Sequence, residues 1–400
     1  MTGETLRKGP TGPCAILPSR PRASAVSRRF PGLARAASGH LVALALALAG
    51  AALPAAPACA ADDLPFDPRV TSIARMLGGI APDYALHAPL ASDRAWQAHR
   101  DWLAPRWQRL RAGRLRALEA WRDEALAAEH PRCRTLFYPF SGPDFLNAYL
   151  LFPLCDTYVF IGLEPPGALP ELDRMPRREV AQTLHDMRAA LGDLLALNFF
   201  MTNNMAAQLD TPRIRGVLPV LAASMGAIRA RIVAIRAFDV GGASAATAVR
   251  SVAVAFYHPD IGKLQTLYYF SADASDAGLR AQPQLARYVA SLRPAAVLVK
   301  SASYLLHQPG FARMRETILE IADPLVQDDT GIPYRILRER GWDMRLYGAY
   351  SGPISLFASR RQPELEAAYQ RGDGRQLPFA FGYKGTRDGS NAMVARLAGR

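Results

Sequence analysis

Residues 133–162 read CRTLFYPFSGPDFLNAYLLFPLCDTYVFIG, and this stretch decides the fold. Two short aromatic and aliphatic runs, starting at Thr135 and at Thr157, have the composition of buried strands. Between them, Ser141-Gly-Pro-Asp144 has the composition of a helix N-cap, and residues 145–152 carry apolar side chains at helical spacing. The stretch therefore predicts a strand–helix–strand unit whose two strands are parallel and adjacent.

The two cysteines of this stretch, Cys133 and Cys155, each lie two residues before a predicted strand. Because the strands are parallel neighbours, both cysteines fall at the same edge of the sheet, within reach of a disulfide in an oxidising compartment. Closing that loop would stabilise the fold by roughly 3 kcal/mol on the chain-entropy estimate. Two reduced, buried cysteines are the alternative.

The opposite ends of the same strands carry polar residues. Ser141, Gly142 and Asp144 follow the first strand, and Glu164 follows the second. Ligands of open α/β sheets gather at the carboxyl ends of strands, so these residues are candidate site residues. In the alternative interpretation, Ser141 and Asp144 only cap a helix and Glu164 faces solvent. The loop also resembles a dinucleotide or methyl-donor site, but it has one glycine where such sites have three, and we expect no cofactor.

The N-terminal region has the layout of a bacterial secretory signal. An apolar run over residues 41–53 follows several arginines, and Ala58-Cys-Ala60 has the small residues that signal peptidase requires. We therefore expect residues 1–60 to be a cleaved signal peptide and the protein to be periplasmic. A membrane anchor is the alternative, although the run is shorter than the roughly 20 residues that a bilayer needs. A lipoprotein modified at Cys59 and twin-arginine rather than Sec export are further alternatives.

Charge and composition limit the class of protein. The 400 residues have a formal net charge of +13, and half of them are apolar. Residues 1–60 contain seven Lys or Arg and one Glu, so the expected mature chain has a net charge of +7. Because we expect the chain to be exported, we expect no nucleic-acid partner. We expect a helical N-terminal segment over residues 61–130 and an α/β domain over residues 131–400.

A long Arg-rich helical segment is predicted over residues 92–129, with Asp93 as its N-cap and Pro105 as a break or first-turn residue. Apolar residues mark one side of this segment, at Trp96, Leu103, Trp107, Leu110, Leu118 and Trp121. Arginines crowd the remainder, at Arg106, Arg109, Arg111, Arg114, Arg116 and Arg122. Such a helix suits an anionic membrane surface or an acidic partner. The alternative is a solvated helix face whose tryptophans pack on a core.

The middle of the chain predicts two helices and then an antiparallel meander, which makes the sheet mixed. The helical patterns cover residues 177–209, where the pattern becomes polar at Thr202-Asn-Asn204, and residues 216–230. The strand-like runs that follow them cover residues 231–240, 249–257 and 264–270.

A second strand–helix–strand unit is predicted from Thr266 to Ser301, with its helix over residues 283–292. Its likeness to the first unit suggests duplicated halves. Duplication would place Asp273 near the position of Asp144, and Lys300 near that of Glu164. The remaining predicted elements are a helix over residues 311–321, a hairpin over residues 342–358 and a final strand over residues 377–383.

The segment Gln327-Asp-Asp-Thr-Gly-Ile-Pro-Tyr-Arg335 places two adjacent acids before a glycine turn. Asp328 and Asp329 are candidate acid/base groups or cation ligands, and a solvated turn is the alternative. Asp329-Thr-Gly also resembles the aspartic-protease signature, whose chemistry needs two such carboxylates. The chain contains no second copy of that signature, which argues against a protease of this class.

Three segments, FYPFSGPDF (137–145), GLEP (162–165) and QDDTGIPYR (327–335), together resemble a family of exported bacterial proteins of uncharacterised activity. The resemblance covers residues 135–383 and implies no reaction. The chain has no Gly-x-Ser-x-Gly elbow, no P-loop and no clustered metal ligands, so we expect no metal.

The sequence thus predicts a periplasmic α/β protein with a polar cleft that binds or hydrolyses a small polar or envelope-derived ligand. The candidate catalytic residues are Glu164, Asp328 and Asp329, and the candidate ligand-binding residues are Ser141, Asp144, Lys300 and Arg335. The alternative is a non-enzymatic envelope protein that docks to a membrane or an acidic partner through its Arg-rich helical segment.

Overall fold

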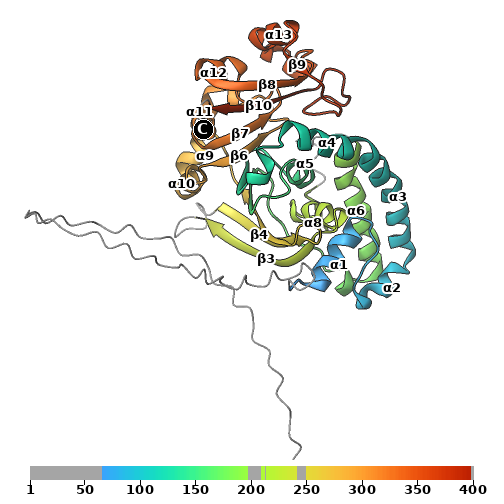
Figure 1. Cartoon of the computed structure of the whole chain (residues 1–400). Helices are drawn as coiled ribbons and strands as arrows, with labels where there is room; N and C mark the ends of the chain where they lie inside the picture. Colours follow the sequence, from blue (N-terminus) through green and yellow to red (C-terminus); the bar gives the residue numbers. More distant parts are fainter. Residues whose placement is uncertain (1–64, 197–208, 212, 241–248, 398–400) are drawn as a thin grey trace, which may run out of the picture. The chain divides into compact units, whose positions relative to one another are not determined.

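A computed structural model describes residues 65–196, 209–211, 213–240 and 249–397, and in these residues ten strands form one mixed sheet (Figure 1). The strands lie side by side in the order β3-β4-β5-β2-β1-β6-β7-β10-β8-β9. Their bounds are β1 Thr135–Tyr138, β2 Thr157–Gly162, β3 Arg231–Val240, β4 Val249–His258, β5 Lys263–Ser271, β6 Ala295–Val299, β7 Ala322–Gln327, β8 Trp342–Gly348, β9 Gly374–Arg375 and β10 Asn391–Leu397. The predicted α/β class with a mixed sheet is confirmed.

The centre of the sheet is parallel and contains the predicted strand–helix–strand unit. β1 pairs with β2 in parallel, with Phe137 opposite Val159, and helix α5 connects the two strands. β5 continues the parallel sheet beyond β2, and β6 and β7 continue it beyond β1. β3, β4 and β5 form the predicted antiparallel meander at one end. β10 adds to β7 in antiparallel orientation, and β8 adds to β10 in the same way.

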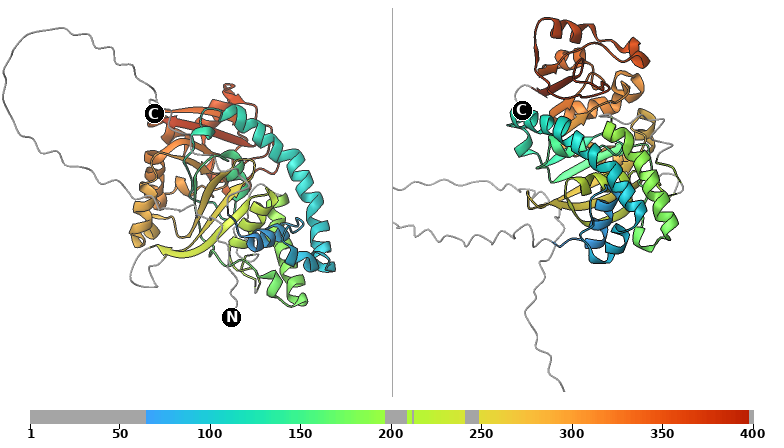
Figure 2. Two further views of the ribbon diagram at one scale, coloured as in Figure 1. Left: turned by 60° about the horizontal axis from the view of Figure 1, so that its bottom comes forward. Right: turned by 90° about the vertical axis from the view of Figure 1, so that its right-hand side faces the viewer.

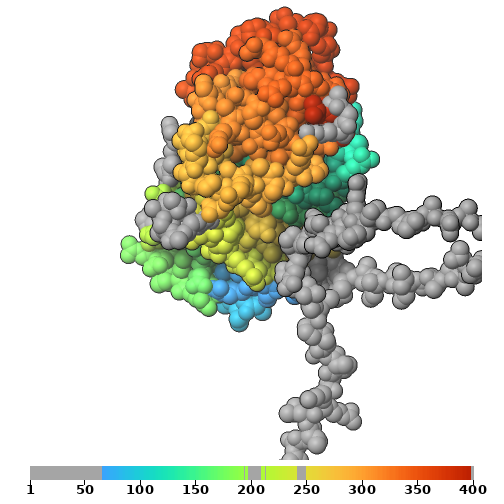
Figure 3. All heavy atoms as spheres, turned by 90° about the vertical axis from the view of Figure 1, so that its left-hand side faces the viewer, coloured from blue at the N-terminus to red at the C-terminus, as the bar shows by residue number. Residues whose placement is uncertain are grey.

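Helices cover both faces of the sheet because side chains alternate along its strands. Leu136 and Tyr138 of β1 belong to one apolar cluster, and Phe137 belongs to the other. Helices α1, α3 to α6 and α8 pack in the first cluster, and α9 to α13 pack in the second (Figure 2). The part of the chain that contains the second set of helices forms the orange surface in Figure 3. The helix bounds are α1 Pro68–Leu77, α2 Ala88–Ala91, α3 Arg94–Leu110, α4 Arg116–Ala125, α5 Phe145–Leu151, α6 Arg177–Ala196, α8 Leu218–Ala227, α9 Asp276–Ala281, α10 Pro283–Ala290, α11 Ala312–Ile321, α12 Tyr334–Glu339 and α13 Pro363–Gln370.

The Arg-rich helical segment forms α3, a π-helical turn over Arg111–Leu115, and α4. Asp93 caps α3 as predicted, since its carboxylate accepts the N–H of Ala95 at 2.8 Å. All six apolar residues of the predicted side are buried. The expectation that Pro105 is a break or a first-turn residue is wrong, because α3 begins at Arg94 and continues through Pro105. Pro105 removes the hydrogen bond to the carbonyl of Asp101, and both residues are exposed, so water can satisfy that carbonyl.

Two predictions for the C-terminal part are wrong. β8 does not fold back on itself as a hairpin over residues 342–358, because β10 supplies its antiparallel partner and a 3₁₀ helix over Ser355–Arg360 follows. Residues 377–383 form no strand, and the last strand is β10 instead. The apolar residues of this segment, Leu377, Phe379 and Phe381, are buried in the first cluster, so their alternation reflects burial without a β-ladder.

The second strand–helix–strand unit differs from the first in its place in the sheet. β5 and β6 are both part of the parallel centre, as predicted, but β2 and β1 lie between them. The helices α9 and α10 that connect β5 to β6 pack on the opposite face from α5. Duplicated halves therefore stay a prediction, without a matching strand order to support them.

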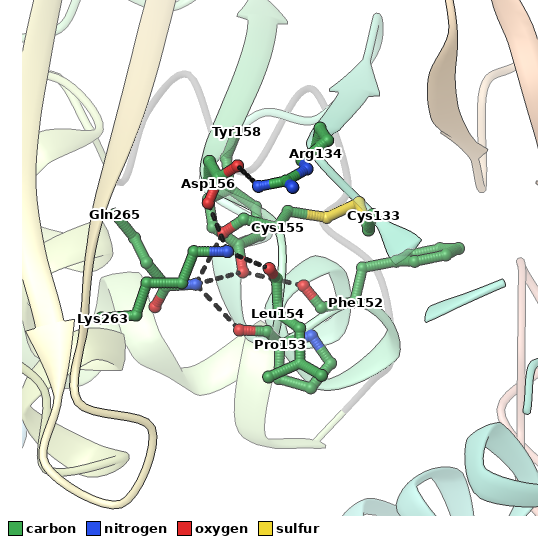
Figure 4. The surroundings of a disulfide bond; sticks show 10 residues. All are labelled: Cys133, Arg134, Phe152, Pro153, Leu154, Cys155, Asp156, Tyr158, Lys263 and Gln265. Atoms are coloured by element: carbon green, nitrogen blue, oxygen red, sulfur yellow. Dashed lines mark hydrogen bonds and ion pairs between the residues drawn. A yellow bond between two sulfur atoms is a disulfide. The ribbon is translucent and has the colours of Figure 1, made fainter. Parts of the chain in front are cut away.

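The sulfurs of Cys133 and Cys155 are bonded, as predicted, and join the starts of β1 and β2 (Figure 4). The loop before Cys155 is also held by β5. Gln265 donates to the carbonyls of Pro153 and Cys155 at 2.8 and 2.7 Å, and Lys263 donates to that of Leu154 at 2.9 Å. The starts of β1 and β2, at the opposite end of the strands from the candidate site, are thus held by a covalent link and by hydrogen bonds from β5.

All described residues belong to one compact unit, residues 58–400, in which the Arg-rich helical segment and the sheet share the first apolar cluster. Within the described ranges, every helix is too short or too polar to cross a membrane. The signal peptide expected over residues 1–60 lies outside the described residues. So does the end of the helix expected over residues 177–209, including Asn203 and Asn204.

Candidate ligand-binding site

A cavity of about 210 Å³ opens at the carboxyl ends of four parallel strands. Its walls come from the residues that follow β1, β2, β5 and β6. The helix after β1 packs on one face of the sheet, and the helix after β6 packs on the other. Because β1 and β6 are neighbours, their loops diverge and leave a crevice between them. Ligands of open α/β sheets bind at this kind of topological switch point.

The cavity wall is mainly apolar and carries two carboxylates. Glu164 follows β2, and Asp273 follows β5. None of the described residues that line the cavity is a lysine, an arginine or a histidine. The apolar part of the wall includes Phe140, Ile161, Leu163, Ala272, Leu305 and Phe311.

Glu164 is the buried charge of this cavity. The residue is only 8% exposed, and burial raises the pKa of its carboxyl. The backbone N–H groups of Leu163 and of Glu164 itself oppose that rise by favouring the charged form. In the described part of the chain, no lysine, arginine or histidine lies within 4.0 Å of this carboxylate. The carboxylate therefore keeps its capacity to bind a group that enters the cavity.

Gly162 and Tyr269 fix the position of Glu164. The hydroxyl of Tyr269 donates to the backbone carbonyl of Glu164 at 2.8 Å, across the β2–β5 pair. A Cβ atom at position 162 would lie 2.4 Å from that hydroxyl and 3.2 Å from Oε2 of Glu164. A side chain at position 162 would therefore displace the groups that place the carboxylate, and this is why glycine stands there.

The wall that follows β6 is a tightly turned loop, residues 301–304. Ser301, Ser303 and Tyr304 have positive φ angles of 53°, 49° and 53°, in the left-handed region that residues other than glycine seldom adopt. The hydroxyl of Ser303 lies 2.8 Å from that of Tyr383, which donates to the carbonyl of Ser301 at 2.8 Å. The hydroxyl of Ser301 is buried and has no hydrogen-bond partner within the described ranges.

Asp328 and Asp329 lie behind this loop and hold it. Asp328 accepts the N–H of Ser301 at 2.9 Å, and Asp329 accepts the hydroxyl of Tyr304 at 2.5 Å. Asn391 of β10 donates to Asp329 at 3.0 Å. Burial raises the pKa of Asp328 to about 7, and the neighbouring charge of Asp329 adds to the rise. Burial also raises the pKa of Asp329. Neither carboxylate lines the cavity, so in this structure both support its wall.

Asp144 and Lys300 meet each other rather than the cavity. Their charged groups are 2.9 Å apart, and their side chains are 3% and 1% exposed. Asp144 also accepts the Tyr138 hydroxyl at 3.2 Å and the Asn147 side-chain amide at 2.8 Å. It is the N-cap of α5, a role that the sequence assigned to Ser141 and Asp144 jointly. Asp144 and Lys300 therefore form a buried ion pair at the ends of the strands, and neither lines the cavity.

The remaining candidate residues lie apart from the cavity wall. Ser141 is buried and donates through its N–H and its hydroxyl to the carbonyl of Ile161, at 3.0 and 3.2 Å. It ties the loop after β1 to β2. Arg335 is exposed on α12, where it pairs with Glu339 at 3.5 Å. Of the seven candidate catalytic and ligand-binding residues, Glu164 alone lines the cavity, and Gly142, which the sequence placed at the same end of the sheet, lines it as well.

Sequence reasoning missed the two phenylalanines and the serine loop of the wall. Phe140 and Phe311 contact each other with ring centroids 6.0 Å apart, although one follows β1 and the other precedes α11. Ser301 and Ser303 come directly after Lys300, which the sequence did single out. Polar residues that follow a buried strand could have indicated this loop, but the prediction stopped at Lys300 and did not include Ser301 and Ser303.

Of the six arginines that the sequence singled out, Arg109, Arg111 and Arg116 are exposed, and Arg94 and Arg100 of α3 are exposed as well. Arg106 stacks on Trp102 at 3.7 Å, and burial lowers the pKa of Arg114 to about 10. Because the tryptophans at 96, 107 and 121 are buried in the core, this segment offers no apolar stripe for insertion into a membrane. Docking of this surface to a membrane or an acidic partner stays a prediction.

Comparisons of the chain with protein-family models, with curated proteins and with solved structures give no match. The resemblance carried by the three sequence motifs therefore stays a prediction. Within the part of the chain that the structure describes, no group of three or more His, Cys, Asp or Glu side chains is arranged to hold a metal ion.

Proposed function

We propose that the protein binds a small ligand in the cavity at the ends of β1, β2, β5 and β6, and that Glu164 recognises it. The observation that carries this proposal is the burial of Glu164 in a cavity wall with no cationic side chain of the described chain beside it. A cavity at a topological switch point, mostly apolar and with few polar groups, is the usual form of a small-molecule site.

The raised pKa of Glu164 also supports a reaction on that ligand. A carboxyl group whose pKa is raised holds a proton more readily than a free carboxyl group, and groups with such shifts serve as general acids or bases in active sites. Hydrolysis of a small envelope-derived ligand is therefore the second candidate function, with Glu164 as the proton-transferring group. The disulfide supports export to an oxidising compartment, and we place the protein in the periplasm.

Saturation-transfer NMR with five single-ring probes tests the binding proposal. The probes are benzyl alcohol, benzylamine, benzoate, cyclohexanol and methyl glucoside, offered to the exported chain and to a cavity-filling variant. Leu305→Trp adds an indole at a half-buried wall position, and Leu86→Trp makes the same change at a position that is 72% exposed and outside the cavity.

We expect at least one probe to bind the exported chain and Leu86→Trp, and to lose its signal with Leu305→Trp. If no probe distinguishes Leu305→Trp from Leu86→Trp, the cavity is not a binding site and the proposal is overturned. Circular dichroism of both variants checks that each is folded.

A further inference from the structure

The chemistry of the cavity wall selects among ligands. We propose that the ligand carries a positive charge, as an amine does, next to an apolar or aromatic body. This inference rests on the proposed function, because it names the class of ligand for the same cavity. Its experiment separates a wrong ligand class from a failed binding site.

The charged side chains of the cavity wall are all acidic within the described residues. Glu164 and Asp273 are the charged residues among the described residues that line the cavity, and both are acidic. Asp273 is exposed at the rim, where its carboxylate accepts the N–H and the hydroxyl of Ser275 at 2.8 and 2.7 Å. An anionic ligand would meet two negative charges and no cationic side chain, whereas a cation would be attracted by both.

Glu164 differs from other buried carboxylates of the protein in its partners. Glu129 is as buried as Glu164, at 8% exposed, and has the guanidinium of Arg345 at 2.6 Å. Asp144, buried more deeply, has Lys300 at 2.9 Å. Asp328 and Asp329 are buried too, and they accept hydrogen bonds from the N–H of Ser301 and the hydroxyl of Tyr304. A buried carboxylate without such a partner is costly, because it loses its hydration and gains no opposite charge. Within the described chain Glu164 has no such partner, so a cationic ligand would supply what Arg345 supplies to Glu129.

The cavity wall also contains two aromatic rings. Phe140 and Phe311 are half-buried and lie edge to face at 6.0 Å. Aromatic rings attract organic cations through their negative faces and also pack on the apolar body that carries the charge. Carboxylate and aromatic groups together form the type of wall that recognises amines and quaternary ammonium groups.

Three probes of nearly equal shape test the ligand class: benzylamine as the cation, benzyl alcohol as the neutral form and benzoate as the anion. Isothermal titration calorimetry at pH 8 gives the dissociation constant of each for the exported chain. We expect benzylammonium to bind at least 10-fold more tightly than benzyl alcohol, a difference of about 1.4 kcal/mol. Benzoate should bind more weakly than either.

Glu164→Gln keeps the shape of the side chain and removes its charge. We expect this variant to bind benzylammonium no more tightly than benzyl alcohol, while its affinity for benzyl alcohol changes less than 3-fold, or about 0.7 kcal/mol. Glu339→Gln removes an exposed acid on α12 and should leave all three constants unchanged. Thermal unfolding of both variants shows whether each is folded.

The other outcomes separate the two proposals. If benzyl alcohol or benzoate binds as tightly as benzylammonium, in a way that Leu305→Trp abolishes, the cavity binds ligands but the cationic class is wrong. If benzylammonium binds equally well to Glu164→Gln, the charge of Glu164 does not recognise it and the inference is overturned. The inference also fails if none of the three probes binds, or if all three bind equally to Leu305→Trp and Leu86→Trp. The saturation-transfer comparison with five probes then decides whether the cavity is a binding site at all.

Discussion

Asp144 and Lys300 form an ion pair in which both side chains are almost completely buried. Removing the charge of one member should be costly, because the other charge stays in the interior. We expect Asp144→Asn, which preserves an N-cap residue, to lower the free energy of unfolding by about 3–5 kcal/mol. The double variant Asp144→Asn/Lys300→Met should recover part of this loss. Urea unfolding of the two single variants and the double variant measures the coupling.

Additive effects of the two substitutions would contradict this account of the pair. Additivity would mean that the two charges do not stabilise each other, whatever their distance in the structure. Exposed pairs such as Arg335–Glu339 provide the control, since removing one of them should change stability by less than about 1 kcal/mol.

Asp328 should make the free energy of unfolding decrease as the pH rises. Its pKa is raised from 3.8 to about 7 in the folded state, so the folded protein binds more protons than the unfolded chain between these values. The stabilisation from this group is fully present below about pH 4 and is lost as the pH rises through about 7. We expect Asp328→Asn to lose this part of the pH dependence. The free energy of unfolding of the wild type, minus that of the variant, should therefore decrease between pH 4 and pH 7.

Urea unfolding at several pH values checks that slope. Asp388→Asn is the control, because Asp388 is 93% exposed in its side chain. A difference between wild type and Asp328→Asn that is constant with pH would show that Asp328 titrates as in the unfolded chain. The constant part of the difference reports the lost hydrogen bond to Ser301.

The sequence placed Glu164 at a ligand-binding edge because the rule about strand ends needs only a correct parallel unit. It could not show that Asp328 and Asp329 are buried. Their burial depends on Asn391 and on the segment that contains Gly382, where a Cβ atom would lie 2.2 Å from Oδ2 of Asp328. Those neighbours are more than 50 residues away in the chain, so no local sequence pattern predicts the contact.

At the scale of elements, the disulfide ties the first two parallel strands together. Closing a loop of 22 residues should contribute about 3 kcal/mol on the chain-entropy estimate. We expect Cys133→Ala/Cys155→Ala to lower the free energy of unfolding by about that amount, and so to unfold at a lower urea concentration, because the unfolded chain loses its constraint. Lys263 and Gln265 should still hold the loop in the folded state.

Mass spectrometry of the exported protein, with and without reductant, provides the covalent check. Two free thiols would contradict the disulfide and leave the reduced, buried pair as the correct alternative. Unchanged stability of the double variant would contradict the stabilising role alone.

The elements that were predicted correctly depend on short-range patterns. β1, α5 and β2 follow from one stretch of 30 residues, and the β3–β4–β5 meander follows from alternation between turn residues. The wrong hairpin over residues 342–358 shows the limit of this reasoning. The alternation of β8 was real, but its partner is β10, which lies beyond α13 in the chain.

At the scale of the whole molecule, Trp121 of α4 joins the Arg-rich helical segment to the C-terminal part. Its ring packs edge to face on Tyr347 at 5.0 Å and on Phe379 at 5.7 Å. We expect Trp121→Ala to lower the free energy of unfolding by about 3–5 kcal/mol, because it opens a cavity in the shared core. Unfolding should remain a single transition for wild type and variant.

Trp102→Ala is the matched control, since Trp102 is only partly buried and stacks with Arg106 at the surface. We expect it to cost less than half as much as Trp121→Ala. Two separate unfolding transitions in the wild type would contradict a shared core and would favour a helical segment that folds on its own.

A crystal structure of the exported chain with benzylammonium tests the central claim most directly. We predict ligand density in the cavity beside Phe140 and Phe311, with the ammonium nitrogen within about 4 Å of the Glu164 carboxylate. Density for the ligand at another place, or in the cavity with its nitrogen turned away from Glu164, would contradict the account.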